Sequence, residues 1–362
     1  MWPMDHPRRR DLLVESLAEL EAEAMLVTRL ENVRYLSGFT GSNAQLLVTP
    51  TGGVLLTDSR YEEQSRHEVP DLERVVYPRA FVPAFGEACR SASIRRVAFE
   101  SAGVTYRTYG ELAAQEGIEL VPSEDVVERL RWTKESGELR LIERAQELTD
   151  EAFDRVIPKL AEGITEARVG FELEVAMREA GAEAVAFDSI VAFGENAAEP
   201  HHGPTDRPLG PGDVVKMDFG CVVEGYHSDM TRTVAFGDPG PKLREVYEVV
   251  RRAQETGREA VRAGVSGSEV DRAARRVIEE AGYGDRFGHS LGHGVGLEIH
   301  EGPGLRRDSD DVLPEGAVVT VEPGVYVPGL GGVRIEDMVE VTAEGCRPLP
   351  RTTRDLVVLE AS

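Results

Sequence analysis

Five residues in the carboxy-terminal half of the chain are of types that bind metal ions. They are four carboxylates and one imidazole: Asp218, Asp229, His293, Glu322 and Glu336. An oxygen-rich set of this kind suits two hard-to-borderline divalent cations that share bridging ligands. Such a set forms a site only if the predicted elements bring the five side chains to one place.

The first two carboxylates lie on a predicted β-hairpin. Asp218 and Asp229 belong to the strand-like runs DVVKMDFGCVV and YHSDMTRTVAF, which meet at Glu224 and Gly225, a two-residue turn. In this register Asp218 faces Thr231, and the two aspartates share one face as diagonal neighbours, about 7 Å apart at the backbone. Like charges that face each other favour a cation between them. The alternative is two solvated carboxylates on an exposed face.

The two glutamates lie on a second pair of strand-like runs. AVVTVEPGVYV contains Glu322 and GVRIEDMVEV contains Glu336, and the turn cluster PGLG at 328–331 lies between the runs. A three-residue loop places the glutamates directly opposite each other, whereas a four-residue loop places them on opposite faces. We therefore predict an odd-length loop or a bulge.

A histidine-rich segment, HSLGHGVGLEIHE, separates the two hairpins and contains His289, His293 and His300 among closely spaced glycines. Each interior glycine costs a helix about 1 kcal/mol against alanine, so we predict irregular backbone packed close to a ligand. Six of the eight histidines lie within 201–300, which favours a common site over scattered core residues.

These motifs resemble the pita-bread metallopeptidases, a family that comprises aminopeptidase P, prolidase, methionine aminopeptidase and the metal-free creatinases. The similar stretches are MDFG, SDMTRT, the histidine-rich segment, EPGVY and GVRIED, in that order, and they span most of residues 137–350. RYLSGFTGSNAQLLV and LLTDSRY resemble the amino-terminal domain of Xaa-Pro peptidases, which small methionine aminopeptidases lack.

The predicted elements indicate two domains. Short β-rich runs alternate with helical stretches over about the first 120 residues, which indicates an α/β domain with a mixed or parallel sheet. Helices predicted over 166–180, 242–263 and 268–281 surround the two hairpins, which describes an α+β domain. Together with the resemblance, this predicts a creatinase-like α/β domain over 1–130 and an α+β pita-bread catalytic domain over 131–362.

Several local predictions accompany this organisation. We expect a helix over 10–24, because its leucines recur at helical spacing, and another that Ser123 would cap. Ser266 and Glu269 form a possible capping box for the helix over 268–281. Asp58 and Arg60 are interpreted as a local salt bridge or strand cap rather than a substrate contact.

The resemblance implies a role for each metal-ligand candidate. Asp218 would bind one ion and His293 the other, Asp229 and Glu336 would bridge, and Glu322 would be both ligand and proton shuttle. Two bridged ions lower the pKa of a shared water and give a hydroxide nucleophile near neutral pH. This donor set suits Mn²⁺, with Co²⁺ or Zn²⁺ able to substitute.

The resemblance also assigns residues around the ions. A tertiary Xaa-Pro amide has no N–H, so its nitrogen must be protonated on leaving. His201 and His300 match the positions that handle protons and polarise the carbonyl. His289, Tyr326 and Arg334 match positions that line the proline pocket, although His289 could be a packing residue and Arg334 could simply neutralise the acidic cluster.

Three more residues lie near these motifs: Thr231, His202 and His227. Thr231 would orient a bridging carboxylate from behind. His202 and His227 match no family position, so we interpret them as surface or structural histidines.

Three functions fit these observations. The first is cleavage of Xaa-Pro bonds in short proline-containing peptides. The second is another enzyme of the fold, but the amino-terminal domain disfavours a methionine aminopeptidase, and the five retained ligands disfavour a creatinase. The third is a non-catalytic peptide-binding protein, which would not need all five ligands. Dipeptidase and aminopeptidase activity stay open, since Arg34, Arg60 or Arg334 could each hold a dipeptide carboxylate. The resemblance further implies a homodimer.

Composition limits the partners and the compartment. The chain of 362 residues has 65 acidic and 41 basic residues, a net charge of −24, which opposes binding to nucleic acid or anionic membranes. Cys89, Cys221 and Cys346 are too few and isolated for a disulfide framework. The first residues lack the apolar core of a secretory signal, and no apolar run approaches the roughly 18 residues of a membrane span. We therefore expect a cytoplasmic protein.

Overall fold

The computed structural model describes residues 4–361, and the chain divides into two compact units between Arg131 and Trp132. Within the described residues no helix has both the length and the apolar character that crossing a membrane requires. The three cysteines are free thiols.

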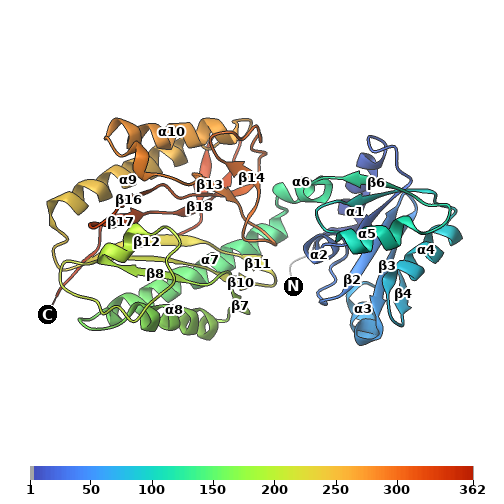
Figure 1. Ribbon diagram of the computed structural model, residues 1–362, viewed down its shortest axis with the longest axis horizontal. Helices are drawn as coiled ribbons and strands as arrows, with labels where there is room; N and C mark the ends of the chain where they lie inside the picture. The colour runs from blue at the N-terminus through green and yellow to red at the C-terminus, as the bar shows by residue number, and fades with distance from the viewer. Residues whose placement is uncertain (1–3, 362) are drawn as a thin grey trace. The chain divides into compact units, whose positions relative to one another are not determined.

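The amino-terminal unit is an α/β domain with one mixed sheet, which confirms the predicted class (Figure 1). The strand order is β4-β3-β2-β1-β5-β6, in which β1 with β2 and β2 with β3 are antiparallel and the other pairs are parallel. Helices α4 and α5 pack against it around Phe85 and Leu112. The strands are β1 (Ala24–Val27), β2 (Ala44–Thr49), β3 (Gly52–Asp58), β4 (Glu73–Tyr77), β5 (Arg96–Glu100) and β6 (Glu119–Ser123), and the helices are α1 (His6–Leu17), α2 (Leu30–Ser37), α3 (Glu62–Glu68), α4 (Phe81–Ser91), α5 (Tyr106–Ala113) and α6 (Val126–Trp132).

Some local predictions in this unit were wrong. The helix predicted over 10–24 is α1, which spans His6–Leu17 and so starts four residues earlier. Helices α2 and α4 were not predicted. Ser123 does not cap a helix: it is the last residue of β6, pairs with Glu100, and its hydroxyl donates to the carbonyl oxygen of Phe99 at 2.9 Å. Strand pairing therefore overrides the local capping signal. The local role of Asp58 is confirmed, because its carboxylate accepts from the backbone N–H of Arg60 at 2.9 Å and pairs with the guanidinium.

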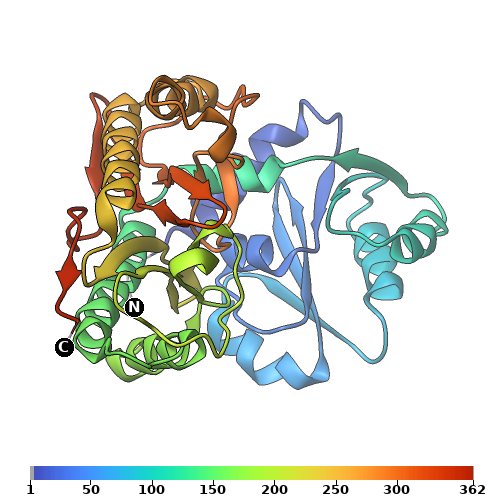
Figure 2. The same ribbon diagram turned by 60° about the vertical axis from the view of Figure 1, so that its left-hand side comes forward.

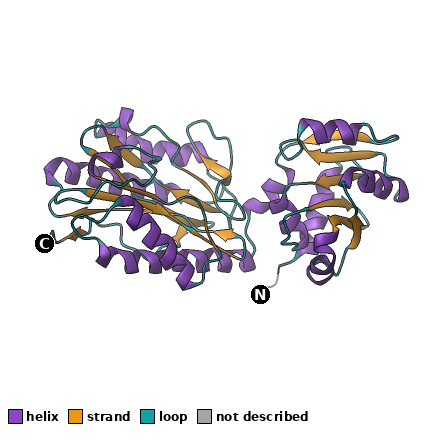
Figure 3. Cartoon of the chain, turned by 60° about the horizontal axis from the view of Figure 1, so that its bottom comes forward, coloured by secondary structure: helices purple, strands orange, loops and turns teal. Residues whose placement is uncertain are grey.

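The carboxy-terminal unit consists of two helix pairs with largely antiparallel strands between them, as Figures 1 and 2 show from two sides. Helix α7 (Ser136–Val156) packs on α8 (Glu166–Ala180), and α9 (Gly240–Ala260) packs on α10 (Gly267–Glu280). Each pair has its own apolar core against nearby strands. This is the predicted α+β class, and Figure 3 shows the strands in orange among the purple helices.

Up to residue 361, the strands of this unit form four sheets, with orders β20-β12-β9-β8, β14-β13-β15-β18-β19, β11-β10-β7 and β16-β17. Their bounds are β7 (Ala184–Val185), β8 (Ile190–Phe193), β9 (Val214–Phe219), β10 (Cys221–Val223), β11 (Tyr226–His227), β12 (Met230–Phe236), β13 (Gly292–Gly294), β14 (Glu301–Leu305), β15 (Val318–Val321), β16 (Gly324–Val327), β17 (Gly331–Arg334), β18 (Asp337–Val341), β19 (Cys346–Pro348) and β20 (Val358–Leu359).

The predicted helix boundaries agree with the structure for α8 and α10, whose first turns are capped by side chains. Helix α8 has the predicted bounds. Helix α10 opens with the predicted capping box, in which Ser266 accepts from the backbone of Glu269 and the Glu269 side chain accepts from the backbone of Ser266. Gly282 follows α10 with a φ of 84°, a left-handed conformation that glycine adopts without a Cβ penalty.

Both hairpin registers are confirmed. Glu224 and Gly225 form the first turn, with φ of 44° and 75°, and Asp218 pairs with Thr231. In the second hairpin Val327 pairs with Gly331, so the loop has the predicted odd length of three residues, 328–330.

The same register runs through both second-hairpin sheets, since Gly324 pairs with Arg334 and Val321 with Asp337. Glu322 and Glu336 therefore lie opposite each other where the β15–β18 sheet passes into the β16–β17 sheet.

Candidate active site

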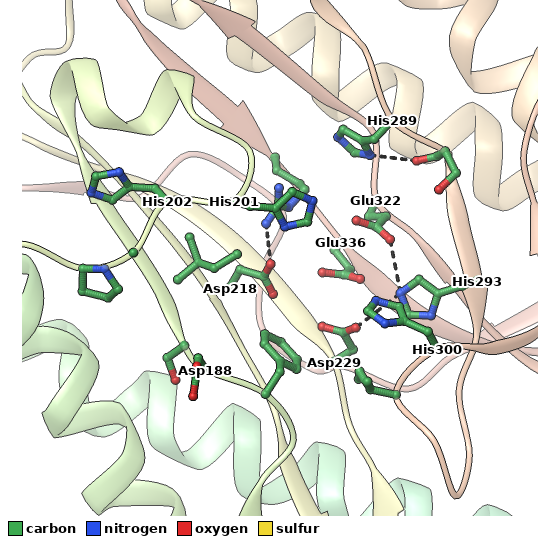
Figure 4. Close-up of a pocket in the computed structure, with 18 residues that line it drawn as sticks. Asp188, His201, His202, Asp218, Asp229, His289, His293, His300, Glu322 and Glu336 are labelled. Carbon is green, nitrogen blue, oxygen red and sulfur yellow. Dashed lines mark hydrogen bonds and ion pairs between the residues drawn. The ribbon is translucent and has the colours of Figure 1, made fainter. Parts of the chain in front are cut away.

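The five metal-ligand candidates converge from three parts of the carboxy-terminal unit (Figure 4). Asp218 lies in β9 and Asp229 directly before β12, His293 lies in β13, and Glu322 and Glu336 lie on the second hairpin. All five line a single cavity of about 650 Å³. The two hairpins and the glycine-rich segment thus supply the walls of one pocket.

His293 faces two of the carboxylates through one ring nitrogen. Its Nε2 lies 3.6 Å from Oδ2 of Asp229 and 3.4 Å from Oε1 of Glu322, whereas its Nδ1 lies 3.0 Å from the carbonyl oxygen of Gly294. Burial and the neighbouring His300 lower the pKa of His293 to about 4, so the ring is neutral near pH 7. Because the carbonyl oxygen only accepts, the ring proton belongs on Nδ1, and the Nε2 lone pair points at the carboxylates.

The carboxylates oppose one another in the folded chain. Burial, followed by the charge of Glu336, raises the pKa of Asp229 well above its usual range, and burial and Glu322 do the same for Glu336. Burial also raises the pKa of Glu322 to about 8. Without a cation, ionisation of these carboxyl groups is disfavoured because their negative charges repel one another and because burial removes the water that would solvate them.

The donor set fits divalent cations. Asp229, His293 and Glu336 each offer one ligand atom, and these atoms lie within 4.8 Å of one another. Oδ1 of Asp218 is buried and has no hydrogen-bond partner among the described residues, so it is available as a further ligand. A lone pair facing carboxylate oxygens, together with an unpaired buried oxygen, is the arrangement that a metal ion completes.

Arg334 connects the acidic cluster to the pocket wall. Its guanidinium is buried, pairs with Asp218, and donates to the hydroxyl oxygens of Thr231 at 3.0 Å and Tyr326 at 2.9 Å. Thr231 in turn donates to Glu336 at 2.7 Å, as expected for a residue that orients this carboxylate from behind. The two interpretations of Arg334, pocket wall and neutralising charge, therefore describe one arrangement.

His289 and Tyr326 form the next link. Nε2 of His289 lies 2.8 Å from the Tyr326 hydroxyl, and Nδ1 lies 2.8 Å from the carbonyl oxygen of Ser290. Burial and Arg334 lower the pKa of His289 to about 3, while burial raises the pKa of Tyr326 to about 12. Both groups are neutral near pH 7, so Tyr326 donates its proton to His289, and the chain of hydrogen bonds from Arg334 runs in one direction.

The structure brings the remaining histidines to the same cavity or near it. His201 and His300 are exposed and line the cavity, and the ring of His300 lies 4.4 Å from that of His293, centroid to centroid. His202 also lines the cavity, but it is not a surface residue: it is 6% exposed and lies 2.9 Å from Glu166 and 2.7 Å from Glu199. His227 contacts the carbonyl oxygen of Gly296.

Three residues that hold the site together were not predicted. The Thr320 hydroxyl accepts from the backbone N–H of His293 at 3.1 Å and donates to Glu322 at 3.2 Å. Thr320 precedes Glu322 by two residues on one strand, so face alternation could have identified it. Glu166 accepts from five groups, of which one is Nε2 of His202, but it lies on α8, where no local pattern points to the site.

The third, Lys216, is the one basic residue of β9, two residues before Asp218, and a basic residue in an otherwise apolar stretch of a buried strand is a usable signal. Its buried ammonium donates to the backbone carbonyls of Ala197, Glu199 and Pro200, directly before His201. Burial and Arg334 lower the pKa of Lys216 to about 7.

The fold and this cluster of carboxylates around a neutral histidine define a metallopeptidase, and the chain belongs to metallopeptidase family M24, whose model matches residues 140–343. The creatinase/prolidase N-terminal domain matches residues 9–133. Membership in the family implies divalent metal ions at the site.

Three relatives cover nearly the whole chain. An Xaa-Pro dipeptidase of Pyrococcus horikoshii is 36% identical over 95% of this chain and 97% of that protein. The structure of an Xaa-Pro dipeptidase from Bacillus anthracis is 38% identical, with a TM-score of 0.96 over 98% of this chain and all of that one. An X-Pro aminopeptidase from Thermotoga maritima is 37% identical, with a TM-score of 0.88 over 95% of this chain and 100% of that one.

Proposed function

We propose that this chain hydrolyses the bond between an amino-terminal residue and a following proline, with two divalent ions in the cavity. The observation that carries the proposal is the geometry of His293, whose unprotonated Nε2 faces Asp229 and Glu322 inside the buried cluster. The relatives named as Xaa-Pro dipeptidase and X-Pro aminopeptidase supply the substrate class.

The proposed ligands are Asp218, Asp229, His293, Glu322 and Glu336. Four carboxylates and one histidine favour Mn²⁺, with Co²⁺ or Zn²⁺ able to substitute. When bound, the ions polarise the scissile carbonyl and lower the pKa of a water toward neutrality.

The chain's own groups then handle protons and position the peptide. The Glu322 carboxyl would take a proton and pass it to the leaving proline nitrogen, a transfer that its position in the cavity and its hydrogen bond from Thr320 support. His201 and His300, exposed at the cavity wall, would polarise the carbonyl and complete the proton path.

The proline ring would lie against the linked set His289, Tyr326 and Arg334. Two neutral groups and one buried guanidinium, joined by hydrogen bonds of 2.8 and 2.9 Å, form a rigid wall for a ring that has no N–H to offer. We further propose a homodimer, which the molar mass from light scattering tests.

The test uses metal-stripped protein reloaded with Mn²⁺ and three matched peptides: Xaa-Pro, Xaa-Pro-Xaa and a methionyl peptide without proline. Cleavage of the dipeptide alone defines a dipeptidase, and cleavage of the tripeptide defines an aminopeptidase. Cleavage of only the methionyl peptide would overturn the proline specificity and keep the metal site. No cleavage of any peptide with metal bound would overturn the enzymatic proposal.

A further inference from the structure

Asp188 is a carboxylate in the active-site cavity that the proposed chemistry does not use. It is exposed, it lines the same cavity as the metal-ligand candidates, and it has no hydrogen-bond or ion-pair partner among the described residues. Asp218, by contrast, is paired with Arg334, and Glu336 accepts from Thr231. A lone charge in a substrate cavity is free to bind an opposite charge on the substrate.

The residues beside Asp188 suit a long aliphatic side chain. Phe187 and Ile190, which lie within two residues of Asp188 in the chain, give the cavity apolar lining, and Ser189 is 4% exposed with its hydroxyl unpartnered among the described residues. Lysine and arginine bury an aliphatic stem against apolar surface while the charged head reaches a polar group. An apolar wall with a free carboxylate beside it matches this shape and charge.

The position of Asp188 separates it from the proline side of the cavity. Figure 4 shows His289 and Asp188 on opposite sides of the carboxylate cluster. If His289 lines the proline pocket, as the proposed function states, Asp188 lies on the side that receives the residue before proline.

The substrate α-ammonium is a poorer partner for Asp188 than a side-chain cation. The α-nitrogen is two bonds from the scissile carbonyl carbon, about 2.5 Å away, so it must stay beside the metal ligands. A lysine Nζ extends about 6 Å from its Cα, and Figure 4 shows Asp188 standing apart from the five ligand candidates.

We propose that Asp188 determines specificity at the residue before proline and selects peptides that begin with Lys-Pro or Arg-Pro. This inference rests on the proposed function and names its substrate class. The carboxylate binds the ammonium or guanidinium, and the Phe187 and Ile190 side chains contact the aliphatic stem. No bond is made or broken at Asp188, so its effect is on the relative kcat/KM of different substrates.

The test compares lysine with norleucine before proline, because the two side chains share a stem and differ in the terminal charge. Lys-Pro-Ala and norleucyl-Pro-Ala are used together with the dipeptides Lys-Pro and norleucyl-Pro, so that either chain-length preference is covered. We expect the wild-type kcat/KM to favour lysine by about fivefold to thirtyfold, the size of a partly exposed charge-assisted contact. The preference narrows as salt is raised, because exposed charges are screened.

Two variants of Asp188 and one control variant test whether Asp188 causes the preference for lysine over norleucine. In Asp188→Asn the lysine-to-norleucine ratio falls to about one, and in Asp188→Lys glutamyl-Pro-Ala becomes a better substrate than Lys-Pro-Ala. Asp206→Asn removes the same charge from an exposed position outside the cavity and retains the wild-type ratio. Norleucyl turnover in each variant shows that the protein is folded and loaded with metal.

An unchanged ratio in Asp188→Asn overturns the inference, as does an equal loss for both substrates, which would mean that Asp188 serves the α-ammonium or the fold. These outcomes differ from failure of the proposed function, in which the wild-type protein cleaves neither the lysyl nor the norleucyl peptide.

Discussion

Removal of the metal ions should make the stability of this protein fall as the pH rises. In the metal-free fold, burial raises the pKa of Glu322 from 4.5 to about 8, and the pKa values of Asp229 and Glu336 are also raised. Between the unfolded and folded pKa the folded chain holds a proton that the unfolded chain has lost. The stabilisation is therefore complete below about pH 4.5 and is lost as the pH approaches 8.

The magnitude follows from this difference in proton binding. One carboxyl of this kind reduces the free energy of unfolding by up to about 1.4 kcal/mol for each pH unit, or about 4 kcal/mol between pH 5 and pH 8. A change of 1 kcal/mol moves the Tm of a unit of this size by about 2 to 4 °C. The metal-free Tm should therefore drop by about 10 °C over this range.

The stabilisation that the metal ions give to the protein should increase as the pH rises. Ions bind the ionised carboxylates, so their affinity and the stabilisation that they give rise with pH. The assay is thermal unfolding followed by circular dichroism at pH 5, 6, 7 and 8, with chelator-treated and Mn²⁺-reloaded samples. The gap between the two Tm values should widen steadily with pH.

A matched pair of variants assigns the effect to the cluster. Glu336→Gln removes a charge that raises the pKa of Asp229, so the metal-free Tm should depend less on pH. Glu315→Gln removes an exposed carboxylate that does not line the cavity and should behave as wild type. Parallel Tm curves for metal-free and metal-loaded wild-type protein would refute the reasoning.

Three further substitutions test individual contacts. Thr231→Val keeps the shape and removes the hydroxyl that donates to Glu336, so metal affinity should fall by about 10- to 100-fold in a chelator competition, and unaltered affinity would contradict this role. His300→Ala should lower kcat by about 10²- to 10⁴-fold with the metal content by mass spectrometry unchanged; normal turnover would exclude proton handling. Lys216→Met removes donors to three carbonyls directly before His201, so kcat should fall with metal retained, and Lys216→Arg should restore part of it. Equal kcat in both Lys216 variants and wild type would show that this loop needs no ammonium.

The sequence predicts the hairpins well because their geometry is local. Side chains alternate along a strand, and a turn of known length fixes which residues face each other, so Asp218 opposite Thr231 follows from Glu224 and Gly225 alone. The odd loop of the second hairpin follows from the requirement that Glu322 and Glu336 share a face.

The environment of His202 could not be predicted in the same way. It follows a Pro and another His in an irregular loop, which indicates a surface position. In the structure His202 is buried against Glu166 on α8. The sequence around Glu166 has no pattern that predicts an inward-pointing carboxylate. Contacts between elements far apart in the chain depend on packing, which no local period records.

Arg334 shows why two competing sequence interpretations can both hold. A guanidinium is a planar fork whose N–H groups point in several directions, so one side chain reaches Asp218, Thr231 and Tyr326 together. Neutralising the carboxylates and forming the pocket wall therefore need no choice between them. Lysine would keep the charge but could not make all three contacts in fixed geometry, so the position of Tyr326 relative to Asp218 and Thr231 depends on arginine here.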